Sequence, residues 1–203
     1  ISKWCQTWLK DRFHKESRYA PNGIDLATFS PVSRDYSAKI RILIEGNSSD
    51  YYKNVDESFL ITNQLDREKY EVWYLSYNGK PKDWYIAERF FHKVPSPQVG
   101  KIYQQCHILL KSSILESFSY PPLEMMATGG IALVAPNGGN AEYLIDRVNC
   151  LLYQSGNIEQ ALQLIAEICQ NSTLRQDLAE QGIATAQNRA WTGIENLILD
   201  LYR

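Results

Sequence analysis

The sequence predicts an α/β fold, with a doubly wound, Rossmann-like parallel sheet of about six strands and helices on both faces. Two observations predict it. From Lys39 onward, short apolar segments with strand-like composition alternate with segments whose apolar residues recur at helical spacing. Turn-forming stretches such as PNGGN, at 136–140, separate several of them. Because such sheets bind ligands beyond the carboxyl ends of their strands, we expect the site in the loops that follow the strands.

The strands are expected at 39–46, 71–76, 89–94, 107–113, 131–135 and 149–153. Helices are expected at 55–65 and 97–106, from near Pro122, and in three segments that close the chain. Pro122 suits a first helical turn because proline has no amide hydrogen to lose there.

The first 31 residues are expected to be the end of a preceding domain and an inter-domain linker, and residues 32–203 to form the globular domain. Ser2 can cap a helix that ends near Lys15 and has one apolar face, formed by Trp4, Cys5, Trp8, Leu9 and Phe13. The following APNGIDLATFSP has the proline and Asn-Gly signals of a connecting loop. The chain has no initiator methionine and opens directly into a helical pattern, so we expect it to belong to a longer protein.

Composition excludes several function classes. With 203 residues, 44% of them hydrophobic, the chain can bury a core without disulfides or metals. A net charge of -2 provides no basic stripe, so nucleic acid is not an expected partner. No apolar run approaches the ~20 residues of a membrane helix and no signal peptide is recognisable, so a cytoplasmic location is expected. The cysteines are predicted to be reduced and buried because they form no CxxC pair; they are Cys5, Cys106, Cys150 and Cys169.

Two glutamates, Glu116 and Glu124, are separated by seven residues, the first after the fourth expected strand and the second in the opening turn of the next helix. A helix N-terminus offers free amide hydrogens and a positive dipole end, so the amides around Ser119, Tyr120 and Leu123 can hold a diphosphate. Carboxylates beside them can accept hydrogen bonds from sugar hydroxyls. We therefore expect both glutamates to face one crevice, which holds a charged ligand with a sugar at each end.

The stretch that begins at Glu116 combines E-x7-E, a small-residue MATGG turn, a strand and PNGGNAEY. In this combination it resembles glycosyltransferase family 4, whose members have the GT-B fold. The resemblance extends from about Tyr19 to Tyr202. It implies that residues 32–203 are the C-terminal half of such an enzyme, the half that binds the nucleotide-sugar donor.

The resemblance also implies roles for individual residues. Lys53 would neutralise the donor diphosphate, Glu116 would act near the transferred sugar as the catalytic residue, and Glu124 would bind the nucleotide ribose. The remaining donor contacts are expected from the loops on either side, at Gly46, Asn47, Ser117, Phe118, Ser119 and Tyr120.

Three residues depart from the family pattern. Asn47 stands where the family usually has an arginine, so one cationic partner for the phosphates is missing. The family's EGFG is ESFS here, so Ser117 and Ser119 replace glycines that let the backbone approach the ligand. A serine can keep the amide contact if its backbone dihedrals stay ordinary, but the pocket is expected to be tighter.

The function implied is retaining transfer of a sugar, of the hexosyltransferase type, from a nucleoside-diphosphate sugar to a hydroxyl acceptor in polysaccharide or glycoconjugate synthesis. No cofactor and no metal is expected, because the chain has no Asp-x-Asp pair for a divalent cation. The acceptor would be bound chiefly by a missing N-terminal domain, which would also supply any peripheral membrane association. The isolated fragment is expected to be inactive.

Three alternatives remain open at this stage. The departures at Asn47, Ser117 and Ser119 favour a non-catalytic nucleotide-sugar or partner-binding module with a decayed site. An NAD-dependent oxidoreductase shares the sheet but needs a glycine-rich turn after the first strand, where this chain has EGNSSD. A glycosidase also uses two carboxylates, but these act from opposite sides of a sugar.

His92 and His107, which flank or begin strands, are interpreted as structural.

Overall fold

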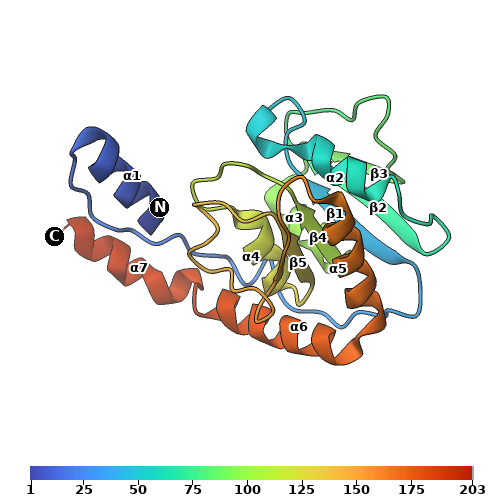
Figure 1. The fold of residues 1–203 in the computed structure, drawn as a ribbon. Helices are drawn as coiled ribbons and strands as arrows, with labels where there is room; N and C mark the ends of the chain where they lie inside the picture. The colour runs from blue at the N-terminus through green and yellow to red at the C-terminus, as the bar shows by residue number, and fades with distance from the viewer. Residues whose placement is uncertain (203) are drawn as a thin grey trace.

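The computed structural model describes residues 1–202 and contains a six-stranded sheet with the order β3-β2-β1-β4-β5-β6 (Figure 1). All neighbouring strands are parallel. The bounds are β1 Ile40–Glu45, β2 Tyr70–Ser76, β3 Arg89–His92, β4 Ile108–Lys111, β5 Ile131–Val134 and β6 Leu151–Leu152. The strand order reverses between β1 and β4, which is where doubly wound sheets open a crevice at their carboxyl edge. The predicted fold class is confirmed.

Helices cover both faces of the sheet (Figure 1). The bounds are α2 Val55–Thr62, α3 Ser96–Gln105, α4 Tyr120–Ala127, α5 Ile158–Gln170, α6 Ser172–Gln187 and α7 Trp191–Leu199, with short 3-10 turns η1 Tyr51–Lys53 and η2 Asp200–Tyr202. Successive residues of β4 point to opposite faces: Leu109 packs with α3 and α4, whereas Ile108 and Leu110 pack with α2 and α5. The three closing helices predicted from the sequence are confirmed. None of the helices in residues 1–202 is long and apolar enough to cross a membrane.

The N-terminal helix, α1 Lys3–Phe13, forms as predicted, and the Ser2 Oγ caps it by accepting a hydrogen bond from the Cys5 amide at 3.2 Å. It ends before Lys15 because His14 adopts a left-handed conformation, with φ 53°. The apolar face of this helix is not enclosed by the rest of residues 1–202: no residue of α1 is buried, and Trp8 and Phe13 are 47% and 52% exposed. Helical spacing identifies an apolar face but not what covers it.

The loop at residues 14–31 is ordered against the domain. The Ile24 amide donates to the Arg189 carbonyl at 2.8 Å, and the Trp191 amide donates to the Ile24 carbonyl at 3.0 Å. Ile24 and Phe29 are buried in the core. These contacts join the loop to the start of α7, and Figure 1 shows α1 and α7 on the same side of the sheet. The division at residue 31 stays a prediction, and the predicted last residue, Arg203, lies outside the described residues.

Arg34 fastens the start of the domain to the ends of two helices. Its Nε donates to the Cys106 carbonyl at 2.6 Å and its Nη2 to the Tyr103 carbonyl at 3.1 Å, both at the end of α3. Its Nη1 donates to the Thr128 carbonyl at the end of α4. A cation there balances the negative end of each helix dipole. Burial lowers the pKa of Arg34 to about 10, so the side chain is charged at neutral pH.

We expect Arg34→Met to lower the free energy of unfolding by about 3 kcal/mol, because it leaves several enclosed carbonyls without donors. Urea titration measures the change. Arg147→Met is the matched control, since Arg147 forms a solvent-exposed ion pair with Glu167 and should cost less than about 1 kcal/mol. Equal effects of the two substitutions would contradict the anchoring role of Arg34.

Candidate functional site

The carboxyl ends of β1 and β4 carry a chain of alternating charges. Ile44 pairs with Leu110, so the next residues, Glu45 and Lys111, lie side by side. The Lys111 Nζ lies 2.5 Å from the Glu45 Oε2 and 3.5 Å from the Glu116 Oε1. The Lys53 Nζ donates to both carboxylate oxygens of Glu116, at 2.9 and 2.8 Å. We call Glu45, Lys111, Glu116 and Lys53 the ion chain.

The ion chain is largely removed from solvent. The Lys111 side chain is 1% exposed and that of Glu116 is 10% exposed. Burial opposes the ionisation of Glu116, but the charge of Lys111 and the hydrogen bond from Lys53 outweigh it and lower the pKa of this carboxyl. Burial likewise opposes the charge on Lys111, but Glu45 and Glu116 outweigh it and raise the pKa of the ammonium. Both groups are therefore ionised at neutral pH.

A cavity of about 230 Å³ opens beside the ion chain. Its walls are mostly apolar, with Leu75, Val94, Val99 and Pro121 among the lining residues, and the rings of Tyr77 and Tyr120 also line it. Its two carboxylates are Glu45, from the ion chain, and Glu124, from α4. The cavity thus combines flat apolar surfaces with anionic hydrogen-bond acceptors.

Several polar groups of the cavity lack ordinary partners. The Ser76 Oγ is buried without a hydrogen-bond partner, and the Tyr103 hydroxyl lies beside Glu124 without completing a hydrogen bond of ordinary geometry. Burial raises the pKa of Glu124 to about 7; the charge of Glu45 adds to this shift, whereas Tyr103 and Lys111 oppose it. Buried polar groups are normally satisfied, so these groups have hydrogen-bonding capacity for a ligand.

The two glutamates predicted to share one crevice are placed differently. Glu124 lines the cavity, whereas Glu116 does not. Glu116 is joined to the cavity wall through Lys111, which contacts Glu116 and Glu45. The separation arises because Glu124 is carried by α4, while Glu116 is bound by Lys111 at the end of β4 and by Lys53 in η1.

The start of α4 has an unusual backbone conformation at Ser119. This residue has φ 70° and ψ 87°, a left-handed conformation that glycine adopts without cost, so its dihedrals are not the ordinary ones. Its hydroxyl is buried without a partner. Pro121 and Pro122 have no amide hydrogen, which leaves the amides around Ser119, Tyr120 and Leu123 as the candidate donors of this helix terminus.

The remaining predicted residues of this loop differ in exposure. The Phe118 side chain is 1% exposed, with its ring against those of Tyr120 and Tyr143, so Phe118 can reach a ligand only through its backbone. Ser117 is exposed, and its carbonyl accepts a long hydrogen bond from the Cys5 Sγ, at 3.6 Å.

The turn after β1 explains the residue that replaces the expected arginine. The Asn47 Nδ2 donates to the Asp50 Oδ2 at 2.9 Å, and its Oδ1 accepts from the Ser49 amide at 3.1 Å, so this side chain closes its own turn. The preceding Gly46 has φ 153°, and a Cβ there would lie 2.9 Å from the Val55 Cγ2. Only glycine fits this backbone next to the ion chain.

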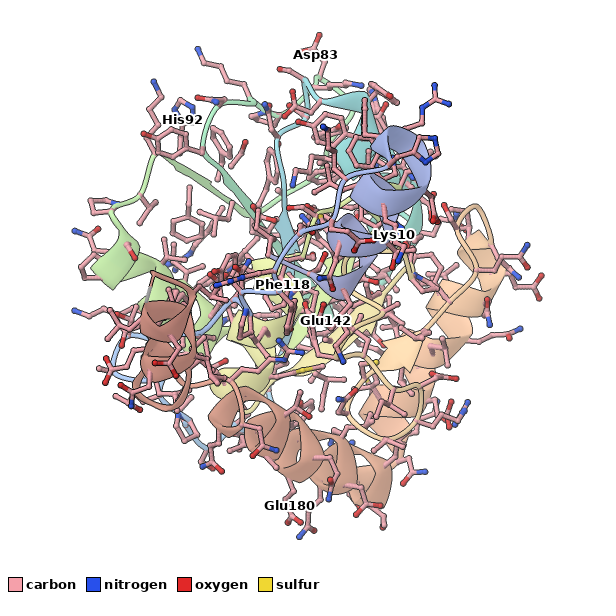
Figure 2. All side chains as sticks on the ribbon, turned by 90° about the vertical axis from the view of Figure 1, so that its left-hand side faces the viewer. Lys10, Asp83, His92, Phe118, Glu142 and Glu180 are labelled. Carbon is pink, nitrogen blue, oxygen red and sulfur yellow. The ribbon has the colours of Figure 1, made fainter. Side chains whose placement is uncertain are left out.

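The loop after β5 lies against both the loop that carries Glu116 and the N-terminal helix α1. A Cβ on Gly139 would lie 2.1 Å from the Glu116 carbonyl oxygen, and one on Gly138 would lie 2.1 Å from the Trp4 Nε1. The Lys3 amide at the start of α1 donates to the Glu142 Oε2 at 2.7 Å. Figure 2 shows α1 in front, with Phe118 and Glu142 near it. The predicted linker segment therefore contacts two loops of the site.

The histidines and cysteines stand outside this site. The His107 Nδ1 accepts from the Arg41 amide at 2.9 Å and its Nε2 lies 3.0 Å from the Asp35 carbonyl, which confirms its structural interpretation. His92 stacks on Phe90, but its Nε2 is buried without a partner, so no hydrogen bond supports a structural role. The four cysteines are free, with Cys106 and Cys150 buried and the other two partly exposed. Within residues 1–202, no three His, Cys, Asp or Glu side chains lie close enough together to hold a metal ion.

Sequence reasoning missed Glu45, Lys111 and Tyr103. One signal for Lys111 was present, since a lysine interrupts the apolar strand HILLKSS. Its pairing with Glu45 depends on the register of β1 and β4, which the residue pattern does not specify.

Comparisons with known proteins bear on the family and the fold of the chain. Residues 87–185 match the family model for group 1 glycosyl transferases. An uncharacterized glycosyltransferase of Methanocaldococcus jannaschii is 29% identical over 94 residues, which are 46% of this chain and 27% of that protein. The chain thus matches a minor part of this relative.

Two solved structures show the fold. The C-terminal domain of the group 1 glycosyl transferase LpcC from Francisella tularensis has a TM-score of 0.65 at 17% identity, over 82% of this chain and 98% of that one. Anabaena HepE in complex with UDP-glucose has a TM-score of 0.77 at 15% identity, over 91% of this chain and 57% of that one. The chain has the Rossmann-like α/β fold found in the C-terminal domains of GT-B glycosyltransferases.

The raised pKa of Glu124 predicts a pH dependence of stability. Folding raises this pKa from 4.5 to about 7, so the folded state binds the proton more tightly than the unfolded state. The stabilising contribution is complete below the unfolded pKa and is lost as the pH rises through the folded one. We expect a loss of about 3 kcal/mol across this window.

Urea titrations at about pH 5 and about pH 8 measure this loss. In Glu124→Gln the difference in unfolding free energy between the two pH values should shrink by most of that amount. Glu195→Gln, at an exposed position of α7, should keep the pH dependence of the unaltered chain. If Glu124→Gln also kept it, Glu124 would not have the raised pKa.

Ser119→Gly is expected to stabilise the chain by about 1 kcal/mol, because it relieves a left-handed serine and removes an unpaired buried hydroxyl. Ser117→Gly in the same loop is the matched control. Ser117 is exposed and is not among the residues with positive φ, so the added chain freedom should cost a few tenths of a kcal/mol or more. Thermal and urea unfolding both report the difference, and destabilisation by Ser119→Gly would contradict the assigned strain.

Proposed function

We propose that this chain is the donor-binding part of a group 1 glycosyltransferase of family 4 type, which holds a nucleoside-diphosphate sugar across the carboxyl ends of β1 and β4. One observation carries the proposal: a cavity with an enclosed carboxylate, Glu124, lies beside the start of α4 and the ion chain. The family-model match over residues 87–185 and the UDP-glucose complex of the structurally similar HepE support it.

The nucleoside fits the cavity by its chemistry. A base can lie against the apolar walls and the rings of Tyr77 and Tyr120, and Glu124 can accept hydrogen bonds from ribose hydroxyls. The unpartnered Ser76 hydroxyl on the same wall can bond a polar edge of the nucleoside.

The diphosphate would lie at the start of α4. The amides around Ser119 and Tyr120, at the positive end of the helix dipole, and the ammonium of Lys53 are the groups that would hold it. As the bond between the sugar and the phosphate breaks, negative charge grows on the leaving diphosphate, and fixed donors stabilise that charge without a metal ion.

The transferred sugar would lie near Glu116. This carboxylate is ionised and held in place by two lysines, so it can orient sugar hydroxyls while the anomeric carbon exchanges its phosphate oxygen for an acceptor oxygen. We propose that the exchange retains the anomeric configuration and that the sugar is a hexose.

The acceptor would be bound chiefly by a further domain of the longer protein. This chain spans 57% of the HepE chain, which leaves room for such a half in a protein of similar length. We propose a cytoplasmic enzyme of polysaccharide or glycoconjugate synthesis, with any membrane association through that other domain.

A second candidate is a non-catalytic module that has lost its nucleotide-sugar chemistry. The observation that favours it is the geometry of Asn47, which supplies no cation and closes its own turn. Lys53 donates hydrogen bonds to both oxygens of Glu116, and this pairing also favours the non-catalytic module.

Calorimetry of the chain with UDP, GDP and dTDP separates these candidates, because a decayed module should bind none of them. We expect Lys53→Met to weaken the nucleoside diphosphate that binds by about tenfold or more, since a charge-assisted hydrogen bond is lost. The affinity for the parent nucleoside should change little. Lys101→Met, at an exposed position of α3, is the control; equal loss for both ligands in Lys53→Met would rule out the phosphate role.

We also expect the 203 residues alone to transfer no sugar, because the acceptor site is proposed to lie elsewhere in the longer protein. A radiolabelled-donor assay with a panel of sugar acceptors tests this. Measurable transfer by the isolated chain would refute the division of labour between two domains.

A further inference from the structure

In the function proposed above, Lys111 only helps to hold Glu116, although it is the most deeply buried charge of the region. Its side chain is 1% exposed, and its Nζ contacts the Glu45 carbonyl at 2.9 Å in addition to the carboxylates of Glu45 and Glu116. Burying an ammonium is costly unless it is paired. An apolar residue would fill the end of β4 without this cost, so the charge itself calls for an explanation.

The contacts between Lys53 and Glu116 explain why a buried charge is useful at Lys111. In this structure Lys53 is bound by both oxygens of Glu116, so it must leave that carboxylate before it can hold a phosphate. Leaving a carboxylate buried without a counter-ion typically costs several kcal/mol. Asn47 cannot serve the phosphate in its place, because it is uncharged and closes its own turn.

We propose that Lys111 is the standby counter-ion of Glu116: it keeps this carboxylate paired when Lys53 turns to the diphosphate of the donor. Lys111 is thus a positioning residue, which acts through Glu116 and Lys53 and does not touch the ligand. This inference rests on the proposed function.

Three contacts carry the proposal. The Glu116 Oε1 already lies between the two ammonium groups, 2.9 Å from the Lys53 Nζ and 3.5 Å from the Lys111 Nζ. Lys111 is anchored by Glu45 at 2.5 Å, so it stays in place when Lys53 moves. Among the ion pairs of residues 1–202, Lys53 and Lys111 are the two cations that contact Glu116.

The charges explain why the exchange is favourable. Before the ligand arrives, two lysines face Glu45 and Glu116. When Lys53 turns to the diphosphate, Lys111 is shared by the two carboxylates, each of which keeps a cation within contact distance. The Lys53 side chain is 24% exposed whereas that of Lys111 is 1% exposed, so the more accessible lysine is the one that can reach a ligand.

A double-mutant cycle tests the coupling. Calorimetry with UDP, GDP and dTDP in turn should show that Lys111→Met weakens the diphosphate that binds by about tenfold, a typical size for one charge-assisted contact. In a Glu116→Gln background Lys53 no longer has to abandon a carboxylate. There, Lys111→Met should change the affinity less than about twofold.

The cycle has clear contrary outcomes. Unchanged affinity in Lys111→Met overturns the inference while leaving the proposed function intact. A loss that persists in the Glu116→Gln background means that Lys111 only supports the fold, and also overturns it. If the unaltered chain binds none of the three nucleotides, the proposed function fails, and the ligand-free measurement below decides the ion-pair behaviour by itself.

That measurement is a carboxyl NMR titration of Glu116. In Lys53→Met, Lys111 should hold the pKa of Glu116 at or below its ordinary value, and in Lys53→Met/Lys111→Met the pKa should rise clearly above it because burial then acts unopposed. Lys53→Met/Lys82→Met is the control, since Lys82 pairs with Asp56 away from Glu116. A pKa that rises as far in Lys53→Met as in the Lys111 double variant shows that Lys111 does not compensate.

One further variant protects the test against misfolding. If Lys111→Met alone leaves Glu45 unpaired and does not fold, Glu45→Gln/Lys111→Met removes both charges of the buried pair and replaces it with neutral side chains of similar length. This double variant then takes the place of Lys111→Met in both measurements, with the same expected and contrary results.

Discussion

The parallel pairing of β1 with β4 is the contact on which the site depends. It places the last residues of two central strands, Glu45 and Lys111, next to each other at the carboxyl edge of the sheet. Lys111 then reaches Glu116 in the following loop, and Glu116 holds Lys53 from the turn before α2. A shift of one residue in this register would turn the lysine to the other face of the sheet and take the ion chain apart.

The two glutamates of the site have opposite electrostatic environments. Glu116 has two lysines within contact distance, which lower its pKa in spite of burial. Glu124 has no such ion pair, and burial raises its pKa to about 7. A site that keeps one carboxylate firmly charged and the other near its titration point can treat two ends of a ligand differently. The contrast comes from the charged partners of each buried group and not from its residue type.

The fold was largely predictable because its signals are local. The six strands and the closing helices follow from alternating apolar segments and from turn residues such as those of PNGGN. The cap of α1 by Ser2 and the start of α4 near its prolines depend on neighbours in sequence, and both were found. The exposure of the Trp8 and Phe13 side chains could not be predicted, because periodicity does not show what lies opposite a helix.

By itself, the sequence determined the class of fold and the positions of most strands, turns and caps, because these depend on residues close along the chain. Only the tertiary structure decided which charges meet. The pairing of Lys111 with Glu45 and the contact of Glu116 with Lys53 join segments far apart in the sequence. Such contacts are set by strand register and packing, which the order of residues along the chain does not specify.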